Sequence, residues 1–356
     1  MVVKDTRDTP FLTGVVGSMP RSQFVRDLLD PELMPDEPSD VSHRMDAAVD
    51  YILALQESAG LDIVSDGEYR RRSYIGIIGD VAEGFELERK DGLWWHTVTE
   101  PLEVTRPGMA AEEAKYLIAR TDRQVKVCLP SPYLLGQRMW DVERSRRAYA
   151  TREDFMWALV PVLRGELEAL IEAGANVVQF DDPHLCLFVD NQVRARYDNP
   201  DREIDLCVDL LNQILDGMEG VSRGIHLCRR NKGRDGWVGE GGYGPIIPAL
   251  KALKVDQYVM EFTIPVAGDL SVLSELPGDR QVGLGCVDCR GEHIDSVTEI
   301  VERVEKALEY LEPGQILLNP DCGFAPGNAA EIPIDEAYSK LCNEAEAAAV
   351  LRVKYG

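Results

Sequence analysis

The sequence lacks any apolar run that approaches the roughly 20 residues needed to cross a membrane as a helix, so we expect no membrane association. The first residues, MVVKDTRDTP, contain neither an apolar core nor a cleavage signal, and we expect no secretory leader. Basic residues are scarce: 38 lysines and arginines face 62 acidic residues, which gives a formal net charge of -24. Such a charge repels phosphate backbones and argues against nucleic-acid binding.

Internal repeats, low-complexity tracts and flexible linkers are also missing. The 356 residues are 45% hydrophobic and 28% charged, which is typical of a folded globular protein. The 8 cysteines stand at irregular spacings, which without a leader favours a reducing cytoplasm over a disulfide framework. We therefore expect one cytoplasmic domain over residues 1–356. The sequence leaves open whether several copies form a homo-oligomer.

Short β-rich runs alternate with helical patterns along the chain. Each run is rich in β-branched and apolar residues, as expected for strands of a parallel sheet that is buried on both faces. The runs lie at residues 11–18, 62–68, 125–130, 176–182, 224–228, 257–262, 281–288 and 315–322. Eight strands alternating with helices predict an α/β fold of the (β/α)8 (TIM) barrel type, while a doubly wound open sheet has the same alternation.

Helical periodicity is clearest in the second half of the chain. Leu163 and Leu167 share one face of a helix that Gly174 can end. A second apolar stripe follows in residues 297–311, and residues 333–352 predict the closing helix.

Residues 84–108 interrupt this alternation. Aromatic, β-branched and polar residues alternate around an Asp-Gly pair at 91–92, which predicts a β-hairpin inserted beside the barrel mouth. Trp94, Trp95 and His96 either line an entrance or pack the hairpin onto the body, and packing is the simpler interpretation.

Polar and thiol side chains stand at the carboxyl ends of the predicted strands, where barrel enzymes carry their reactive groups. These positions hold Gly17, Ser18, Asp66, Gly67, Glu68, Asp181, Asp182, His184, His226, Cys228, Glu261, Asp288 and Cys322. They predict one functional site at one rim of the barrel.

A metal site is expected at this rim. His226 and Cys228 lie two residues apart, so their side chains point the same way from an extended strand. With Cys322 they supply one imidazole and two thiolates, the ligand set that Zn²⁺ favours. Glu261 is expected to be a fourth, oxygen ligand that leaves when substrate arrives. Either motif taken alone has a simpler interpretation, namely packed thiols and a core histidine.

The expected ligands indicate thiol chemistry. Zinc held by two thiolates is suited to binding an incoming thiol and lowering its pKa. The bound thiolate stays nucleophilic, which suits transfer of a methyl or other alkyl group to sulfur.

Several segments match those of a known family, in order and over nearly the whole chain. They are VVGSMPRS (15–22), GLDIVSDGEYRR (60–71), VVQFDDP (177–183), HLCRRN (226–231), GGYGPIIPAL (241–250), VMEF (259–262), GLGCVDCR (283–290) and NPDCGF (319–324). On these segments the chain resembles the C-terminal catalytic barrel of cobalamin-independent methionine synthases and their shorter single-barrel relatives. The superfamily also includes uroporphyrinogen decarboxylase and epoxyalkane:coenzyme M transferases.

This resemblance implies a role for each matching residue. The family's zinc ligands fall on His226, Cys228, Glu261 and Cys322. Its contacts to the amino-acid substrate fall on Gly17, Ser18, Glu68 and Asp181. The first two of these would hold the carboxylate, and the two acids would hold the ammonium group. The resemblance thus implies a methyltransferase acting on homocysteine in methionine biosynthesis.

Two departures from the full-length family members concern the methyl donor. They have an additional N-terminal barrel, which helps bind folate, and we expect no counterpart of it in this chain. Arg290 stands where a proton-donating histidine follows the strand-end aspartate, here Asp288, and His293 lies nearby. An arginine does not act as an acid at neutral pH, so these residues favour a methyl-corrinoid protein over methyl-folate as the donor.

Other interpretations stay open. Opening of an epoxide by a coenzyme M-like thiolate would need a cationic pocket such as Arg70–Arg72. A metal-free decarboxylase and a non-enzymatic module are further alternatives. Cys286 and Cys289 form a CxxC pair, of which Cys286 is expected to pack and Cys289 has no assigned role. His184 either lines the pocket or stabilises its wall.

Overall fold

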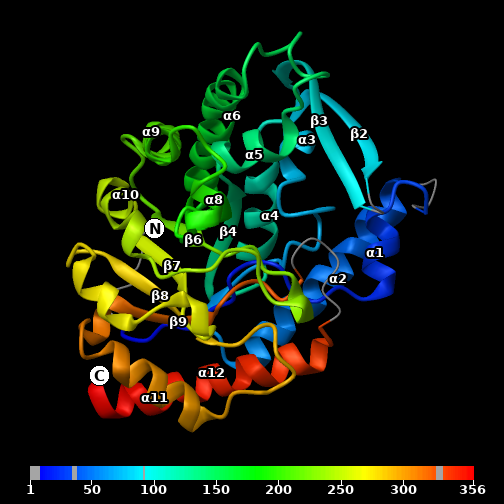
Figure 1. Cartoon of the computed structure of the whole chain (residues 1–356). Coiled ribbons are helices and arrows are strands. Elements are labelled where there is room, and N and C mark those ends of the chain that lie inside the picture. Colours follow the sequence, from blue (N-terminus) through cyan, green and yellow to red (C-terminus); the bar gives the residue numbers. More distant parts are fainter. Residues whose placement is uncertain (1–8, 34–37, 91–92, 326–331) are drawn as a thin grey trace.

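The computed structural model describes residues 9–33, 38–90, 93–325 and 332–356. A parallel sheet of seven strands curls upon itself at the centre, and helices cover it on the outside (Figure 1). In spatial order the strands are β1 (Ile63–Val64), β4 (Gln124–Pro130), β5 (Val177–Asp181), β6 (Ser222–Leu227), β7 (Gln257–Glu261), β8 (Gln281–Val287) and β9 (Ile316–Pro320).

Residues 11–14 close this sheet into a barrel. Thr13 bridges Leu318 of β9, and Gly14 bridges Ile63 of β1, both in parallel. The N–H of Gly14 donates to the carbonyl oxygen of Leu318 at 3.2 Å, and the N–H of Ile63 donates to that of Thr13 at 2.9 Å. With this segment all eight predicted strands take part, and the expected (β/α)8 barrel is confirmed.

The first predicted strand, 11–18, pairs only near its start because buried side chains bind its next carbonyl groups. Lys126 donates a hydrogen bond from Nζ to the carbonyl oxygen of Val15, and Gln179 donates one from Nε2 to that of Val16 at 3.1 Å. The two residues that follow are thereby released from the sheet and reach the rim.

The strand predicted at 62–68 is short for a similar reason. Gln56, from a helix on the outside of the barrel, accepts the N–H of Ser65 at 3.0 Å and donates to its carbonyl oxygen at 2.7 Å. The chain then turns, and Glu68 has a φ of +59°, in the left-handed region that non-glycine residues seldom adopt.

The outer layer consists of helices that connect successive strands. They are α1 (Gln23–Leu29), α2 (Pro38–Ala59), α3 (Ile77–Val81), α4 (Met109–Ile118), α5 (Pro132–Met139), α6 (Arg152–Ala173), α7 (Pro183–Leu187), α8 (Asn191–Arg194), α9 (Pro200–Leu215), α10 (Ile247–Ala252), α11 (Val297–Ala307) and α12 (Ile334–Tyr355). As predicted, α6 ends at Gly174, whose φ is +88°. None of the helices in the described residues is long and apolar enough to cross a membrane.

The predicted insertion is an antiparallel hairpin of β2 (Ala82–Lys90) and β3 (Leu93–Val104), with its 91–92 turn outside the described residues. The hairpin stands apart from the barrel, beside α1 and α3 (Figure 1). Trp94 Nε1 donates to Asp30 Oδ1 at 3.3 Å, just beyond the end of α1. The hairpin is therefore fastened to the outer layer on the side where the strands end.

Candidate active site

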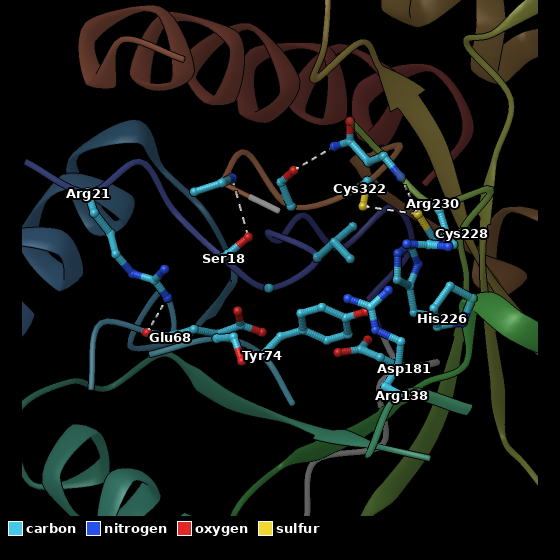
Figure 2. A pocket seen from close by; sticks show the side chains of 17 residues that line it. Ser18, Arg21, Glu68, Tyr74, Arg138, Asp181, His226, Cys228, Arg230 and Cys322 are labelled. Atoms are coloured by element: carbon cyan, nitrogen blue, oxygen red, sulfur yellow. Dashed lines mark hydrogen bonds between the residues drawn. The ribbon is translucent and has the colours of Figure 1, made fainter. Parts of the chain in front are cut away.

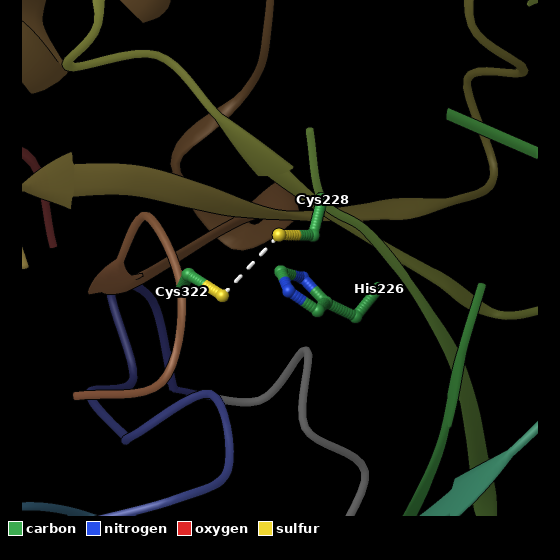
Figure 3. A group of neighbouring side chains, drawn as sticks. All are labelled: His226, Cys228 and Cys322. Carbon is green, nitrogen blue, oxygen red and sulfur yellow. Dashed lines mark hydrogen bonds between the residues drawn. The ribbon is translucent and has the colours of Figure 1, made fainter. Parts of the chain in front are cut away.

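Three of the four predicted metal ligands meet at the carboxyl-terminal rim of the barrel (Figure 3). His226 lies near the end of β6, Cys228 directly follows that strand, and Cys322 follows β9. Their ligand atoms all lie within 4.8 Å of one another, and the two Sγ atoms are 3.3 Å apart. Parallel strands end at one edge, which is why residues so distant in sequence converge.

The protonation of these groups suits a soft cation. Burial lowers the pKa of His226 to about 3, so the imidazole is neutral and keeps a free lone pair. Both of its ring nitrogens are buried without a hydrogen-bond partner among the described residues. The hydrogen bond with Cys228, followed by burial, raises the pKa of Cys322. A pair of thiolates therefore forms here when a cation compensates their charge.

Glu261, the predicted fourth ligand, is not part of this group. Its carboxylate ends β7 but faces two arginines. The backbone N–H of Arg229 donates to Oε2 at 2.7 Å, and the guanidinium of Arg290 pairs with Oε1. Arg290 also pairs with Asp321 at 3.2 Å. Charge-assisted hydrogen bonds thus occupy both oxygens of Glu261, and its role as a metal ligand stays a prediction.

Glu68 and Asp181, predicted to hold an amino group, lie together. Their carboxylate oxygens and the Sγ of Cys128 are buried and fall within 4.8 Å of one another. Burial, and then the charge of Glu68, raises the pKa of Asp181 to about 7, and burial also raises the pKa of Glu68. Two carboxyl groups this close resist ionising together, so the site favours a cation between them. Cys128 lies on β4, and its place beside this pair carried no sequence signal.

Gly17 and Ser18 lie next to this pair. A Cβ atom at position 17 would stand 3.0 Å from Oε1 of Glu68, so glycine permits the close approach of the backbone. The carbonyl oxygen of Ser18 accepts the N–H of Phe324 at 2.8 Å, and its Oγ accepts the N–H of Ala325 at 3.3 Å. Ser18 therefore joins the first strand to the loop after β9.

These groups line one pocket with a volume of about 150 Å³ (Figure 2). Ser18 and Glu68 lie on one side of it, and His226 and Cys228 on the other. The wall also contains residues that the sequence analysis missed: Arg21, Tyr74, Arg138, Arg230 and Asn231. Three of these lie within three residues of a predicted strand end: Arg230, Asn231 and Arg21. Tyr74 and Arg138 belong to a loop and a helix, where the strand-end rule gives no signal.

None of the predicted acid–base residues after β8 lines this pocket. Asp288 accepts the backbone N–H groups of Arg290 at 2.8 Å and of Gly291 at 2.9 Å, so it shapes a turn. Arg290 is buried in the ion pairs described above. His293 is exposed and contacts Glu299 of α11 at 3.1 Å. The structure therefore does not bring His293 to the pocket as a proton donor.

The cationic pocket of Arg70, Arg71 and Arg72 that the epoxide alternative would need does not form. Each side chain is directed to a different partner instead. The partners are, respectively, Asp46 at 2.5 Å, Glu113 at 2.5 Å and the carbonyl oxygen of Leu29 at 3.2 Å. Because none of the three lines the pocket, the coenzyme M alternative loses its predicted sulfonate site.

The remaining candidates lie around the pocket rather than in its wall. Cys286 and Cys289 are buried free thiols, so the CxxC pair is not a disulfide. His184 packs against Tyr133 with ring centroids 6.4 Å apart and does not line the pocket.

A smaller hollow of about 40 Å³ adjoins the pocket beneath the hairpin and shares part of its wall. Its lining includes Trp94, Trp95 and His96 of β3, together with Tyr74 and Arg138. The aromatic residues of the hairpin therefore line a hollow that shares Tyr74 and Arg138 with the pocket.

The (β/α)8 barrel gathers an imidazole, two thiols and a pair of carboxyl groups around one pocket at its rim, which is the arrangement of a barrel enzyme with a candidate metal site. The family model for the catalytic domain of cobalamin-independent synthases matches residues 11–349, and the chain belongs to this family. It is a methyltransferase of the methionine synthase type.

Curated relatives and solved structures agree with this assignment. A methionine synthase of Pyrococcus abyssi is 28% identical over 352 residues, which cover 96% of this chain and 92% of the relative. A methionine synthase of Sulfolobus acidocaldarius is 25% identical, with 96% and 92% covered. A solved B12-independent methionine synthase from Shewanella sp. W3-18-1 has a TM-score of 0.81 at 21% identity, with 97% of this chain and 99% of that chain covered. The last comparison supports the barrel fold.

Proposed function

We propose that this chain transfers a methyl group to the thiol of homocysteine and so forms methionine. One observation carries the proposal: His226, Cys228 and Cys322 gather their ligand atoms in the wall of a pocket that also presents Glu68 and Asp181. The curated relatives, named as methionine synthases, support it. So does the Shewanella structure, which is described as a complex with selenomethionine, an analogue of the product.

The three gathered side chains fit zinc. A buried neutral imidazole without a partner and two adjacent thiols form the nitrogen and sulfur donor set that Zn²⁺ prefers. When bound, the ion would lower the pKa of an incoming thiol and so make its sulfur nucleophilic at neutral pH. We leave Glu261 out of this ligand set because Arg229 and Arg290 already bind its two oxygens.

The other side of the pocket would hold the amino-acid part of the acceptor. An ammonium group between Glu68 and Asp181 would compensate two carboxylates that repel each other. The backbone of Gly17 and the hydroxyl of Ser18 would bind the carboxylate, as in the family. Anchoring both groups fixes the direction of the thiol, which lowers the entropic cost of reaching the transferring methyl group.

We infer that a methyl-corrinoid protein delivers the methyl group. Arg290 supports this part of the proposal, because it is buried between Glu261 and Asp321 and its guanidinium does not release a proton near neutral pH. Transfer from methyl-folate leaves an amine that must be protonated, whereas a corrinoid leaves as a reduced cobalt complex without gaining a proton.

Metal analysis tests the proposal. The purified protein should carry about one zinc ion per chain, and zinc K-edge absorption should gain a sulfur neighbour when homocysteine is added. Cys322→Ser and His226→Ala should lose most of the metal and the methyl transfer. Cys342→Ser, which alters a thiol of α12 outside the pocket, is the matched control and should retain both.

Full turnover by the metal-stripped protein would refute the zinc-dependent mechanism and favour the metal-free, decarboxylase-like alternative. If the protein bound zinc but no thiol, the metal site would be supported and homocysteine would be refuted as the acceptor.

A further inference from the structure

Two arginines in the pocket wall have no acidic partner among the residues that the structure describes. Arg138 comes from the last turn of α5, and Arg230 lies two residues after Cys228. Both side chains are half-buried. Neither forms an ion pair with an acidic residue in the described part of the chain, and Nε of Arg138 is buried without a hydrogen-bond partner. The pair therefore brings positive charge into the pocket that no ion pair neutralises directly, although Glu68 and Asp181 line the same pocket.

This arrangement is unusual for this molecule. The chain has 62 acidic residues, and buried arginines near the site, such as Arg71, Arg229 and Arg290, are all paired with acids. Two half-buried guanidinium groups without acids cost free energy in the empty pocket, because they lose hydration and repel each other. Consistent with this, burial and the charge of Arg230 lower the pKa of Arg138.

Neighbouring residues hold both side chains in position. The guanidinium of Arg138 stacks on the ring of Trp95 from the hairpin, 4.3 Å from the ring centroid. Arg230 has a φ of +59°, a conformation that is costly for a residue with a side chain and that often marks functional positions. The next residue, Asn231, fixes this turn by donating from Nδ2 to the carbonyl oxygen of Gly323 at 3.0 Å.

We propose that Arg138 and Arg230 form an anion-binding subsite that takes a carboxylate, sulfonate or phosphate group of a substrate. Guanidinium groups bind such oxyanions through charge-assisted, often paired hydrogen bonds. The hydroxyl of Tyr74, in the same wall, is a further donor. The subsite lies on the side of the pocket that holds His226 and Cys228, away from the carboxylate position expected at Ser18 (Figure 2).

The inference depends on the proposed function in one respect: the ligand of the subsite is taken to be one of the two substrates of methyl transfer. The acid group belongs either to the thiol acceptor or to a small methyl donor. The first source leaves the corrinoid donor untouched but moves the acid group of the acceptor from Gly17 and Ser18 to the two arginines. The second source keeps the acceptor in place and replaces the corrinoid by a small acidic compound.

Titration calorimetry with inorganic phosphate and with sulfate tests the subsite directly. The wild-type protein should bind both anions. Arg138→Gln and Arg230→Gln should each weaken binding about tenfold, the effect of losing one charge-assisted hydrogen bond. Arg138→Lys should recover part of the affinity because it keeps the charge. Arg147→Gln removes an exposed arginine outside the pocket and should bind as the wild type does.

A series of thiols then identifies the source of the anion. If the acceptor supplies it, the two Gln variants should bind 2-mercaptoethanesulfonate or homocysteine less tightly but 2-mercaptoethanol equally well. If the donor supplies it, all thiols should bind unchanged, and phosphate should inhibit methyl transfer competitively with the donor only in the wild type.

The subsite would be overturned if the wild-type protein bound neither phosphate nor sulfate. It would also be overturned if both Gln variants bound these anions as tightly as the Arg147→Gln control does. Circular dichroism confirms that each variant is folded. Binding of phosphate or sulfate requires neither a thiol nor methyl transfer. The binding result would therefore stay valid if the proposed function failed, and the two failures can be told apart.

Discussion

Asp181 stands at the end of β5, buried beside Glu68. Its pKa of about 7, raised first by burial and then by the Glu68 charge, places its ionisation in the physiological range. An ammonium ion bound between the two carboxyl groups would favour the charged form of both. The affinity for an amino thiol should therefore depend on the protonation of Asp181.

Two matched ligands test this dependence. Homocysteine and 4-mercaptobutyrate differ only in the amino group. The ratio of their affinities therefore removes the effect of thiol ionisation that the two ligands share. We expect this ratio to rise about tenfold from pH 6 to pH 8, as Asp181 loses its proton. Asp181→Asn should lower the ratio and make it independent of pH. A ratio that stays constant in the wild type would contradict the assigned role.

Stability provides a second readout for the same variant. The pKa of Asp181 is raised by folding from 3.8 to about 7, so ionising it favours the unfolded chain. Its contribution to stability is fully present below about pH 4 and is lost as the pH rises to about 7. Asp181→Asn should therefore unfold at a higher temperature than the wild type at pH 8, while it binds homocysteine less well.

At the residue scale, much of the site was predictable because strand ends in a barrel carry its reactive groups. That rule found His226, Cys228 and Cys322. It also proposed Glu261 as a ligand, and this stays a prediction, since a sequence does not reveal that Arg290 pairs with this carboxylate. Arg138 was not predicted, since it comes from a helix whose orientation only the packed structure fixes.

Among the elements, the β2–β3 hairpin connects the outer layer to the site. It is fastened to the barrel body where Ser145 Oγ donates to the carbonyl oxygen of Val98 at 2.5 Å. Its Trp95 supports Arg138 by stacking. The hairpin therefore contributes to the geometry of the pocket although it adds no strand to the barrel.

Removing this support should weaken the anion subsite. Trp95→Ala deletes the stacking partner of Arg138, and we expect phosphate affinity to fall about threefold, in keeping with a partly exposed cation–π contact. Trp157→Ala is the matched control, since that tryptophan is exposed on α6 and lines neither the pocket nor the hollow. Calorimetry on the two variants provides the comparison. Equal affinities would mean that Trp95 does not position Arg138.

The elements themselves were predicted well, and their ends less so. Runs of β-branched residues buried on both faces gave the positions of the strands and therefore the barrel. The predicted strands at 11–18 and 62–68 were too long because Lys126, Gln179 and Gln56 bind backbone groups that a sheet partner would otherwise take. Such long-range contacts between side chain and backbone leave no periodic pattern in the sequence.

At the scale of the whole molecule, the barrel is closed between β9 and β1 by the short segment 11–14, which we call the seam. Single bridges join this segment to each of the two strands. Arg352 of α12 spans it: Nη2 donates to the carbonyl oxygen of Phe11 at 2.7 Å and pairs with Asp62 at 2.5 Å. Asp62 in turn accepts the N–H of Thr13 at 2.9 Å. The last helix thus fixes the segment that closes the sheet.

Arg352→Ala should consequently lower the free energy of unfolding by about 1–3 kcal/mol, the range for losing hydrogen bonds to a partly buried charged group. Lys354→Ala removes the exposed ion pair with Glu305 two residues later and should have little effect. Urea unfolding compares the two. If both variants lose equal stability, Arg352 does not hold the seam.

The seam also bears on how the enzyme is made. His226 and Cys228 leave the ribosome before Cys322, which lies 94 residues behind Cys228. A nascent chain therefore exposes an incomplete chelating pair until β9 and the residues just after it have been synthesised. The candidate metal site can be completed only when every other strand of the seven-stranded sheet has already been made.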